Sequence, residues 1–443
     1  MLVDAAVRAC DPAELTRDAL SVDRGAQPIT AADAGRPDHL RQGYDGPPKP
    51  SAKAEGLRYR CIAAGKAAVA MAKGASSVLK DRLRGGVIVA PTAESFGAFE
   101  AIAGGHPIPT EGSERGGRRA LEIAGSLESD EELLVLLSGG ASALMAVPAD
   151  GLTLDDTRAA TAQLLRAGAD IYALNTVRKH LSAIKGGWLA ERAAGRVRTL
   201  VISDVVGDDV SVIASGPTVP DASTFADARA LVDRYGGAAV FPAAVVAHLD
   251  RGVRGEIPET PKPRYPALVR STIRVIGNRR HAMLGAGGRA GSLGYHVHLI
   301  EDAVIGEART VAVSHLRAAL ALASTLPRPA CIVSSGETTV RVTGRGKGGR
   351  NQEFALALAP LVAEIGTPTI ALSAGTDGVD GPTDAAGAIV DSTTLDRARA
   401  AGLDPSAYLS DNNAYAFFDA LGGLIHTGPT GTNVGDLQVL LLT

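Results

Sequence analysis

The chain has 443 residues, which is long enough for two or three domains that each bury a hydrophobic core. Its 45 Lys and Arg and 48 Asp and Glu give a formal charge of -3 with no long run of one sign, so neither nucleic acid nor a membrane surface is indicated as a partner. Three widely spaced cysteines favour a reducing compartment, and no segment reads as a signal peptide or a membrane span. We therefore expect a cytoplasmic protein with a small-molecule ligand.

The order of the predicted elements favours an α/β fold. Aromatic residues make up only 4% of the chain and glycines number 52, which suits closely packed helices and sheets better than a β-sandwich. Residues 4–20 read as one amphipathic helix, and residues 22–57 read as an irregular polar excursion. An alternating series of strands and helices begins at Arg58. A Pro- and Arg-rich linker at 251–270 separates it from a second series that starts with the strand at 271–278, so we place the domains at 1–262 and 263–443.

The first strand of the series ends in a glycine and a lysine. The segment YRCIAA predicts a strand, Gly65-Lys66 a tight turn, and the following run of small residues a helix packed closely on a sheet. A lysine at this junction lies beyond the carboxyl end of a strand, where α/β sheets place their ligands. The alternative is an ordinary surface lysine.

A second candidate lies at the end of the apolar strand ELLVLLSGG. The strand is followed by Ser138, Gly139 and Gly140, and then by Ser142, so glycines and hydroxyls stand where an anion could bind. A plain turn is the alternative. The spacing is not Gly-x-Ser-x-Gly, which argues against a hydrolase nucleophile. The helix that begins near Asn175 carries three basic side chains that could bind an anion or form a solvated face: Arg178, Lys179 and Lys185.

Two groups of acidic residues follow predicted strands. Carboxylates at strand ends can hold Mg²⁺ beside phosphates, because this ion needs few protein oxygens and keeps several waters. Solvated loop acids are the alternative. The first group is Asp204, Asp208 and Asp209, and the second is Asp377, Asp380 and Asp384.

Residues 337–354 read as strand, glycine loop and helix. Four glycines lie between Gly344 and Gly349, and a helical pattern begins at Asn351. Backbone amides at a helix N-terminus suit a phosphate or a carboxylate, and Lys347 and Arg350 add two positive charges. The spacing does not match a P-loop, and a tight turn is the alternative.

Ten strings in this order resemble the two-domain glycerate 2-kinases whose C-terminal part is the MOFRL domain. They span residues 63–437 and are AAGKAA, GHPIP, LLSGGASAL, NTVRKHLSAIKGG, ISDVVGDD, IASGPT, GETTV, GGRNQE, SAGTDGVDGPTDAAGA and TGPTGTNVGDL. The chain departs from the family pattern at Ala141, Asn413 and Gly435.

The resemblance implies a kinase that transfers the γ-phosphoryl group of ATP to the 2-hydroxyl of D-glycerate with Mg²⁺. It implies a cleft between a Rossmann-like α/β N-terminal domain and a smaller α/β C-terminal domain, with the MOFRL region at about 330–437. Lys66 and Arg350 would be the catalytic cations. Asp204 would act as a catalytic group or, with Asp377, as a metal ligand. The residues expected at substrate and phosphate groups are Gly65, Ser138, Gly139, Gly140, Ser142, Gly346, Lys347, Gly348 and Gly349.

Two other functions are weighed against this one. An NAD(P)H-dependent hydroxypyruvate reductase acts on a related metabolite, but the chain lacks Gly-x-Gly-x-x-Gly after its first strand. A non-catalytic sugar-acid binding protein is the third reading. The sequence does not determine how many chains associate, and a homodimer is one of the alternatives.

Overall fold

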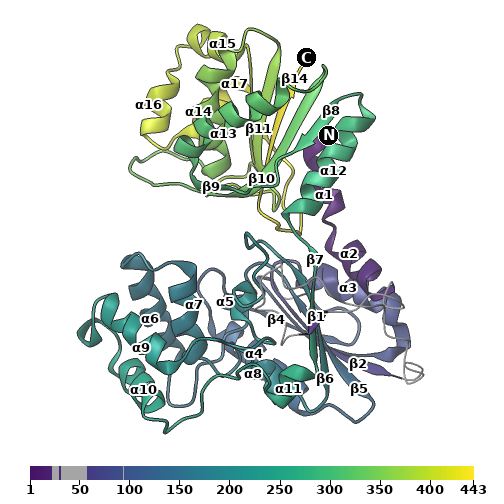
Figure 1. The fold of residues 1–443 in the computed structure, drawn as a ribbon, viewed down its shortest axis with the longest axis vertical. Coiled ribbons are helices and arrows are strands. Elements are labelled where there is room, and N and C mark those ends of the chain that lie inside the picture. Colours follow the sequence, from purple (N-terminus) through teal and green to yellow (C-terminus); the bar gives the residue numbers. More distant parts are fainter. Residues whose placement is uncertain (22–28, 31–56, 93) are drawn as a thin grey trace. The chain divides into compact units, whose positions relative to one another are not determined.

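The structure consists of two compact units (Figure 1). This computed structural model describes residues 1–21, 29–30, 57–92 and 94–443. One unit is Pro12–Ile276, and the other combines Met1–Asp11 with Gly277–Thr443. The sequence placed the division at residue 262 and kept the N-terminus in the first domain, so the structure divides the chain differently. Most of the predicted 22–57 excursion lies outside the described residues.

The larger unit is built on a seven-stranded sheet of order β1-β7-β6-β5-β2-β3-β4. Strand β2 pairs in parallel with β3 and with β5, and the β3–β4 and β5–β6 pairs are also parallel. Counted from β2, this is the order 3-2-1-4-5-6 of doubly wound nucleotide-binding sheets, which confirms the Rossmann-like prediction. The strands are β1 (Ile29–Thr30), β2 (Arg58–Ala64), β3 (Leu83–Ala90), β4 (Phe99–Ala103), β5 (Glu131–Leu137), β6 (Arg196–Ile202) and β7 (Ser271–Gly277).

Helices on both sides of this sheet bury its strands. All seven residues of β5 are buried, as expected for a central parallel strand covered on two faces. The core joins Ile62, Val87 and Leu137 of the sheet to Ile123 and Leu189 of the helices. The helices are α2 (Pro12–Ser21), α3 (Ala68–Leu79), α4 (Glu111–Gly125), α5 (Ala141–Leu144), α8 (Trp188–Arg192) and α11 (Pro266–Val269).

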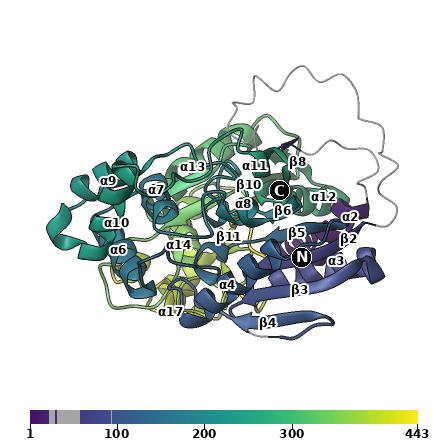
Figure 2. The ribbon, with the colours of Figure 1, turned by 90° about the horizontal axis from the view of Figure 1, so that it is seen from below.

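Four further helices form a cluster at one side of the larger unit (Figures 1 and 2). The cluster has its own apolar core, which includes Leu164, Leu174, Phe225, Val232 and Leu249. It places the end of α7, with its basic side chains, beside the loops that follow the sheet. The helices are α6 (Leu154–Arg166), α7 (Ile171–His180), α9 (Phe225–Arg234) and α10 (Ala243–Val253).

The smaller unit has a mixed sheet of order β13-β12-β11-β14-β10-β8, with β9 also paired to β10. Strand β14 is antiparallel to both β10 and β11, whereas β8 and β9 are parallel to β10. The strands are β8 (His296–Leu299), β9 (Val304–Glu307), β10 (Ala330–Thr339), β11 (Thr369–Gly375), β12 (Gly387–Asp391), β13 (Leu424–Ile425) and β14 (Asp436–Leu442).

Helices pack on both faces of this second sheet. Helices α13 and α14 cover one face, with Phe354, Phe417 and Phe418 in the core, and α1 and α12 lie on the other (Figure 1). The helices are α1 (Leu2–Ala9), α12 (Arg279–Ser292), α13 (Ala308–Ala323), α14 (Arg350–Ala363), α15 (Thr394–Ala400), α16 (Pro405–Ser410) and α17 (Ala414–Leu421).

The predicted helix at 4–20 is two helices that belong to different units. The break falls at Cys10–Asp11, because Pro12 lacks an amide hydrogen and disfavours helical backbone at the residue before it. Helix α1 packs on α12 of the smaller unit, and α2 packs on α3 of the larger one. The chain therefore passes between the units both at 11–12 and at 276–277.

The strand at 271–277 also differs from its predicted place. It was expected to open the second series, but β7 belongs to the first sheet, where it lies between β6 and β1 and pairs with β1 in antiparallel orientation. A strand pattern in the sequence specifies an element and not its neighbours. The Pro- and Arg-rich segment before it returns the chain to the first sheet.

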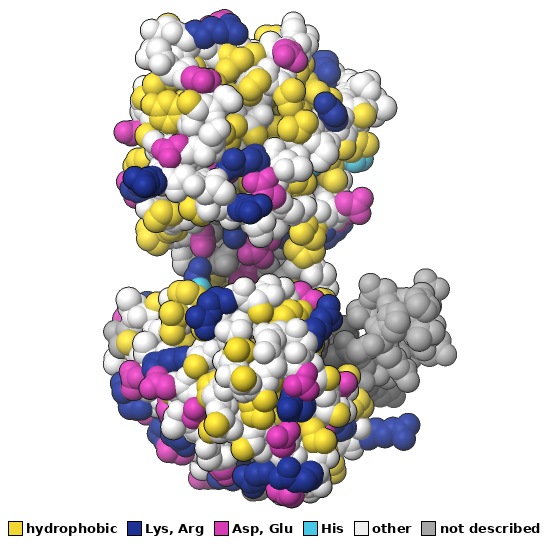
Figure 3. Space-filling view, turned by 90° about the vertical axis from the view of Figure 1, so that its left-hand side faces the viewer, with side chains coloured by type: hydrophobic (Ala, Val, Ile, Leu, Met, Phe, Trp, Pro, Cys, Tyr) yellow, Lys and Arg dark blue, Asp and Glu magenta, His cyan; other side chains and the backbone are white. Residues whose placement is uncertain are grey.

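The surface shown in Figure 3 mixes charges of both signs. On that face of the described residues, Lys and Arg are interspersed with Asp and Glu over each unit, as the small net charge suggests. None of the helices in the described ranges is long and apolar enough to cross a membrane.

Substitutions of two glycines in α12 can test how α1 packs on this helix. A Cβ at Gly285 would lie 2.5 Å from the Cβ of Ala9 and 2.6 Å from the carbonyl oxygen of Ala5, whereas one at Gly288 would have no atom within 4 Å. We expect Gly285→Ala to lower the free energy of unfolding by about 1–3 kcal/mol, because α1 must shift. The matched change Gly288→Ala should raise it by about 0.5–1 kcal/mol through helix propensity. Urea unfolding followed by circular dichroism measures both, and equal effects would contradict this packing.

Candidate active site

Two loops meet at the point where the first sheet changes its winding direction. Strands β2 and β5 are parallel neighbours, and Gly65-Lys66 follows the one while Ser138-Gly139-Gly140 follows the other. Ligands of doubly wound sheets bind outside the carboxyl ends of the strands at this switch point. The structure therefore brings together the two N-terminal candidates that the sequence pointed to separately.

Hydrogen bonds and close contacts fit the two loops to each other. The Lys66 amide donates to the Gly139 carbonyl oxygen over 2.9 Å, and the Ala67 amide donates to the Ser138 hydroxyl over 3.0 Å. Gly65 has a φ of +128°, and a Cβ there would lie 2.1 Å from the Ser138 hydroxyl oxygen. Only glycine fits at residue 65, and the buried Ser138 hydroxyl holds the loops together.

The Gly139 and Gly140 amides are the donors that this junction offers to a ligand. In the described part of the chain, neither amide donates a hydrogen bond to a protein group. Gly140 has a φ of +84°, which turns the backbone at the end of β5. Two adjacent amides in such a turn, close to the Lys66 side of the junction, suit an anionic oxygen.

His106 lies against the same loop. A Cβ on Gly140 would be 2.8 Å from the His106 Cδ2, so the imidazole covers this glycine. Partial burial, and then the positive charge of Lys66, lower the pKa of His106, which favours a neutral ring at pH 7. His106 was not among the predicted site residues, and its position in the GHPIP string was the available signal.

Ser142 lies in the short helix α5 that follows the loop, and it contacts a strained turn. Its hydroxyl lies 2.7 Å from the Ser215 hydroxyl, which donates to the Asn175 side-chain oxygen over 2.8 Å. Ala214 and Ser215 both have left-handed backbones, with φ values of 52° and 59°. Such residues cost roughly 1–2 kcal/mol each, and strain of this kind is common at ligand-binding sites.

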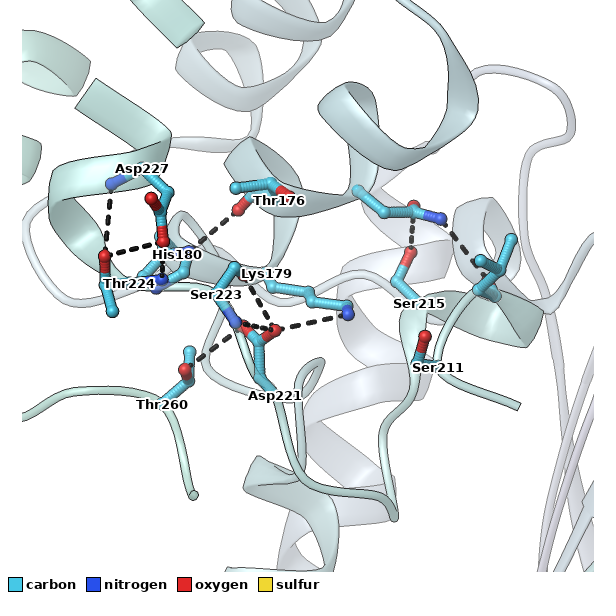
Figure 4. A network of polar contacts seen from close by, with 12 residues as sticks. Thr176, Lys179, His180, Ser211, Ser215, Asp221, Ser223, Thr224, Asp227 and Thr260 are labelled. Atoms are coloured by element: carbon cyan, nitrogen blue, oxygen red, sulfur yellow. Dashed lines mark hydrogen bonds and ion pairs between the residues drawn. The ribbon is translucent and has the colours of Figure 1, made fainter. Parts of the chain in front are cut away.

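The three basic residues after Asn175 have different surroundings. Lys179 is buried and pairs with Asp221 over 3.3 Å, and Asp221 also accepts hydrogen bonds from Ser223 and Thr260 (Figure 4). Lys179 is therefore a structural residue. Arg178 and Lys185 instead approach the carbonyl oxygen of Ser142.

Asp204 lies just beyond the end of β6, the strand next to β5. It is partly buried, as expected of a residue at the mouth of a site. Its neighbour Asp209 is used locally, because it accepts hydrogen bonds from the amide and hydroxyl of Ser211. Asp204 stays a predicted ligand contact, because it follows β6 at the same edge of the sheet as the two loops.

In the smaller unit, Arg350 is the first residue of α14 and is held by two acids. Its Nε lies 2.9 Å from Asp436, which is fully buried, and its Nη1 donates to Glu337 over 3.2 Å. Asp436 also accepts hydrogen bonds from Asn351 and from the Thr338 amide. The guanidinium is thus oriented in advance while a third of its side chain stays exposed.

The glycine loop before Arg350 does not form the predicted anion cradle with its first amides. The amides of residues 343–347 donate to the side chains of Asn412, Asp411 and Asn413 and to the Asp411 carbonyl oxygen. A phosphate at Gly346 or Lys347 would have to displace these internal acceptors. The ammonium group of Lys347 lies 4.4 Å from the centre of the Tyr415 ring.

The N-terminus of α14 already has a carboxylate. Asp380 accepts hydrogen bonds from the amides of Asn351 and Gln352, and its Cγ would lie 2.3 Å from a Cβ on Gly349. Burial raises the pKa of Asp380 to about 6 despite these donors. The Asp380 carboxylate therefore competes with a ligand anion at this terminus, and the assignment of Gly346, Lys347, Gly348 and Gly349 to a phosphate stays a prediction.

The second acidic group is also divided among local roles. Asp380 caps α14, and Asp384 accepts a hydrogen bond from the Tyr415 hydroxyl over 2.8 Å. Asp377 accepts from the Val379 amide within its own turn. Among the described residues, no group of three or more His, Cys, Asp or Glu is placed to hold a metal ion by itself. A Mg²⁺ ion that arrives with phosphates needs only one or two carboxylates, and the assignment of Asp204 and Asp377 to such an ion stays a prediction.

These features define a two-unit α/β protein with a candidate anion site at the switch point of a doubly wound sheet. Residues 1–250 match a family model described as a domain of unknown function, DUF4147, and residues 330–436 match the MOFRL family. The D-glycerate 2-kinase of Thermotoga maritima is 41% identical over 87% of this chain and 91% of its own length. The human glycerate kinase is 33% identical to this chain, and the match covers 100% of this chain and 92% of the human protein.

A solved structure and a third relative extend the comparison. The crystal structure of a glycerate kinase from Thermotoga maritima has a TM-score of 0.79 and 36% identity, and covers 100% of this chain and 99% of its own. A relative from Agrobacterium vitis carries the name "Putative hydroxypyruvate reductase". It is 42% identical to this chain, and the match covers 87% of this chain and 88% of the relative. The chain belongs to the glycerate 2-kinase family with a C-terminal MOFRL domain, as its sequence motifs indicated.

The buried Asp436 offers a test of how Arg350 is held. Asp436→Asn replaces an acceptor oxygen with an amide that faces the donors of Arg350 and Asn351, so we expect a loss of about 3–5 kcal/mol in the free energy of unfolding. Asp419→Asn, at an exposed position on α17, should change it by less than about 0.5 kcal/mol. Urea unfolding compares the two, and wild-type stability in Asp436→Asn would contradict the assigned network.

Proposed function

We propose that this enzyme transfers the γ-phosphoryl group of ATP to the 2-hydroxyl of D-glycerate, giving 2-phosphoglycerate and ADP. The observation that carries the proposal is the junction of Gly65-Lys66 with Ser138-Gly139-Gly140 at the switch point of the sheet. It combines a lysine with two amides that have no acceptor among the described residues, which suits a phosphate. The names of the kinase relatives support the same reaction.

The chemistry asks for few reactive groups. Phosphoryl transfer depends mainly on positioning and on positive charge where the transition state spreads negative charge over its oxygens. We assign this role to Lys66 in the larger unit and to Arg350 in the smaller one. Lys66 acts as a point charge, and Arg350 can contact two oxygens at once. That both act on one pair of substrates stays a prediction.

Mg²⁺ completes the proposed chemistry by neutralising charge on the nucleotide phosphates. Asp204 and Asp377 are the carboxylates that we propose to hold it. Acceptance of the 2-hydroxyl proton falls to Asp204 or to the neutral His106, which lies beside Gly140 and near the charge of Lys66. His106 joins the candidates because the fold brings its loop to β5.

A hydroxypyruvate reductase is the second candidate, because one relative carries that name. Its chemistry requires a nicotinamide cofactor, and the turn between β2 and α3 is Gly65-Lys66-Ala67 instead of a Gly-x-Gly-x-x-Gly turn. Consumption of NADPH or NADH with hydroxypyruvate would support it. Release of ADP with D-glycerate and Mg-ATP separates the kinase from both the reductase and a non-catalytic binding protein.

We also propose that the enzyme works in the cytoplasm, with D-glycerate and ATP as its small-molecule partners. Cys10, Cys61 and Cys331 are free and buried, which suits a reducing compartment.

Lys66 is the first residue to test. We expect Lys66→Met to lower kcat/KM for ADP release by about 10²–10³-fold, because a cation is lost at the phosphate site. Lys73→Met is the matched control: Lys73 lies on α3, is exposed and pairs with Glu94 at the surface. Its kcat/KM should stay within about two-fold of wild type. Similar activity in the two variants would remove Lys66 from the reaction.

Arg350 calls for a milder change, because Arg350→Ala would leave the buried Asp436 without its cation. Arg350→Lys keeps a positive charge beside Asp436 but removes the planar fork. We expect about a 10²-fold loss in kcat/KM with a thermal unfolding midpoint close to wild type. Full activity in this variant would contradict contact of the guanidinium with the substrates.

A further inference from the structure

Two cations converge on one carbonyl group next to the glycine loop. The Lys185 ammonium donates to the Ser142 carbonyl oxygen over 2.6 Å and to that of Met145 over 3.2 Å, and Lys185 is only 5% exposed. The Arg178 guanidinium donates to the same Ser142 oxygen over 3.3 Å. Two positively charged side chains therefore lie side by side behind residues 142–145.

Neither cation has an acidic partner among the described residues. Lys179, one position from Arg178 on α7, shows the contrast, because it pairs with the buried Asp221. Burial lowers the pKa of Arg178 to about 10, and burial together with the charge of Arg178 lowers that of Lys185. Two buried positive charges without a counter-ion are costly, and a bound anion would remove that cost.

Arg178 has unused capacity to bind such an anion. Its guanidinium carries five N–H donors, and one hydrogen bond, to Ser142, is found within the described residues. Its side chain is partly exposed, whereas Lys185 is enclosed behind it. An anion can therefore reach Arg178 from solvent, with Lys185 as a second positive charge at its back.

The type of anion follows from two groups of donors, which are the Gly139 and Gly140 amides in the loop and the Arg178 guanidinium on α7. The Gly139 and Gly140 amides near Lys66 suit the oxygens of a phosphate, as argued above. The planar fork of an arginine matches the two oxygens of a carboxylate. The Ser142 hydroxyl, which contacts Ser215, belongs to the residue between these two groups. A small hydroxy acid carries a carboxylate that such a fork can bind.

We propose that Arg178, supported by Lys185, binds the carboxylate of the acceptor substrate and makes the enzyme select a hydroxy acid over a neutral polyol. This inference rests on the proposed function, because it assigns one end of the acceptor. A site built to pair with a carboxylate disfavours a ligand that lacks one, since its cations then stay without a counter-ion.

The experiment compares Arg178→Met and Arg178→Lys with wild type and with the control Arg166→Met. Arg166 is exposed on α6 and donates a hydrogen bond to the side chain of Gln163. Calorimetry measures the affinity of the full-length protein for D-glycerate, and steady-state ADP release measures the KM for D-glycerate and for Mg-ATP. Circular dichroism checks that each variant is folded.

We expect Arg178→Met to weaken D-glycerate binding and to raise its KM by 100-fold or more, with the KM for Mg-ATP within two-fold of wild type. Arg178→Lys keeps the charge without the planar fork, so its affinity and KM for D-glycerate should lie between those of wild type and Arg178→Met. Arg166→Met should match wild type in both. Activity with glycerol as acceptor should change little in Arg178→Met, because glycerol has no carboxylate.

Three results would overturn the proposal. Near-wild-type affinity for D-glycerate in folded Arg178→Met or Arg178→Lys would show that the carboxylate binds elsewhere. A rise in the KM for Mg-ATP alone would assign Arg178 to the nucleotide phosphates. An equal loss with D-glycerate and glycerol would indicate a general structural effect. A different result would contradict the proposed kinase reaction itself: wild-type protein that binds D-glycerate but releases no ADP with it and Mg-ATP.

Discussion

The fit of two loops at the ends of β2 and β5 is the constraint on which the larger unit's site depends. A side chain at Gly65 would collide with Ser138, and the Ser138 hydroxyl is occupied by the Ala67 amide. The loops can therefore close on each other only with these residues. Once they close, the Gly139 and Gly140 amides have no other partner in the described chain, and His106 and Ser142 lie beside them. The doubly wound order of the strands decides that these loops are neighbours at all.

Buried charge organises both units, but in different ways. In the smaller unit, Asp436 is fully buried and satisfied by Arg350, Asn351 and the Thr338 amide, so the acid orients an arginine whose side chain is partly exposed. In the larger unit, Arg178 and Lys185 donate to the Ser142 carbonyl oxygen and form no ion pair with an acid of the described chain. The charge of Asp436 is balanced without a ligand, whereas a bound anion would balance the charges of Arg178 and Lys185. This difference separates residues that position a cation from residues that bind a substrate group.

Local patterns in the sequence were enough to predict the strand, turn and helix around Lys66 and the glycine turn after β5, and the order of motifs was enough for the family. What the sequence could not show depends on partners far along the chain. The glycine loop before Arg350 read as an anion cradle because nothing local reveals that Asn412 accepts amides of the loop and that Asp380 accepts those at the start of α14. The strand at 271–277 joined the first sheet because pairing, and not pattern, decides the neighbour of a strand. His106 gained a candidate role only when the fold placed it on Gly140.

The central claim is that the enzyme phosphorylates the 2-hydroxyl of a small hydroxy acid. The identity of the product tests it most directly. Wild-type protein incubated with Mg-ATP and D-glycerate should give 2-phosphoglycerate and an equal amount of ADP, as measured by phosphorus NMR and an ADP assay. Formation of 3-phosphoglycerate, or consumption of NADPH with hydroxypyruvate and no release of ADP from D-glycerate, would contradict the account.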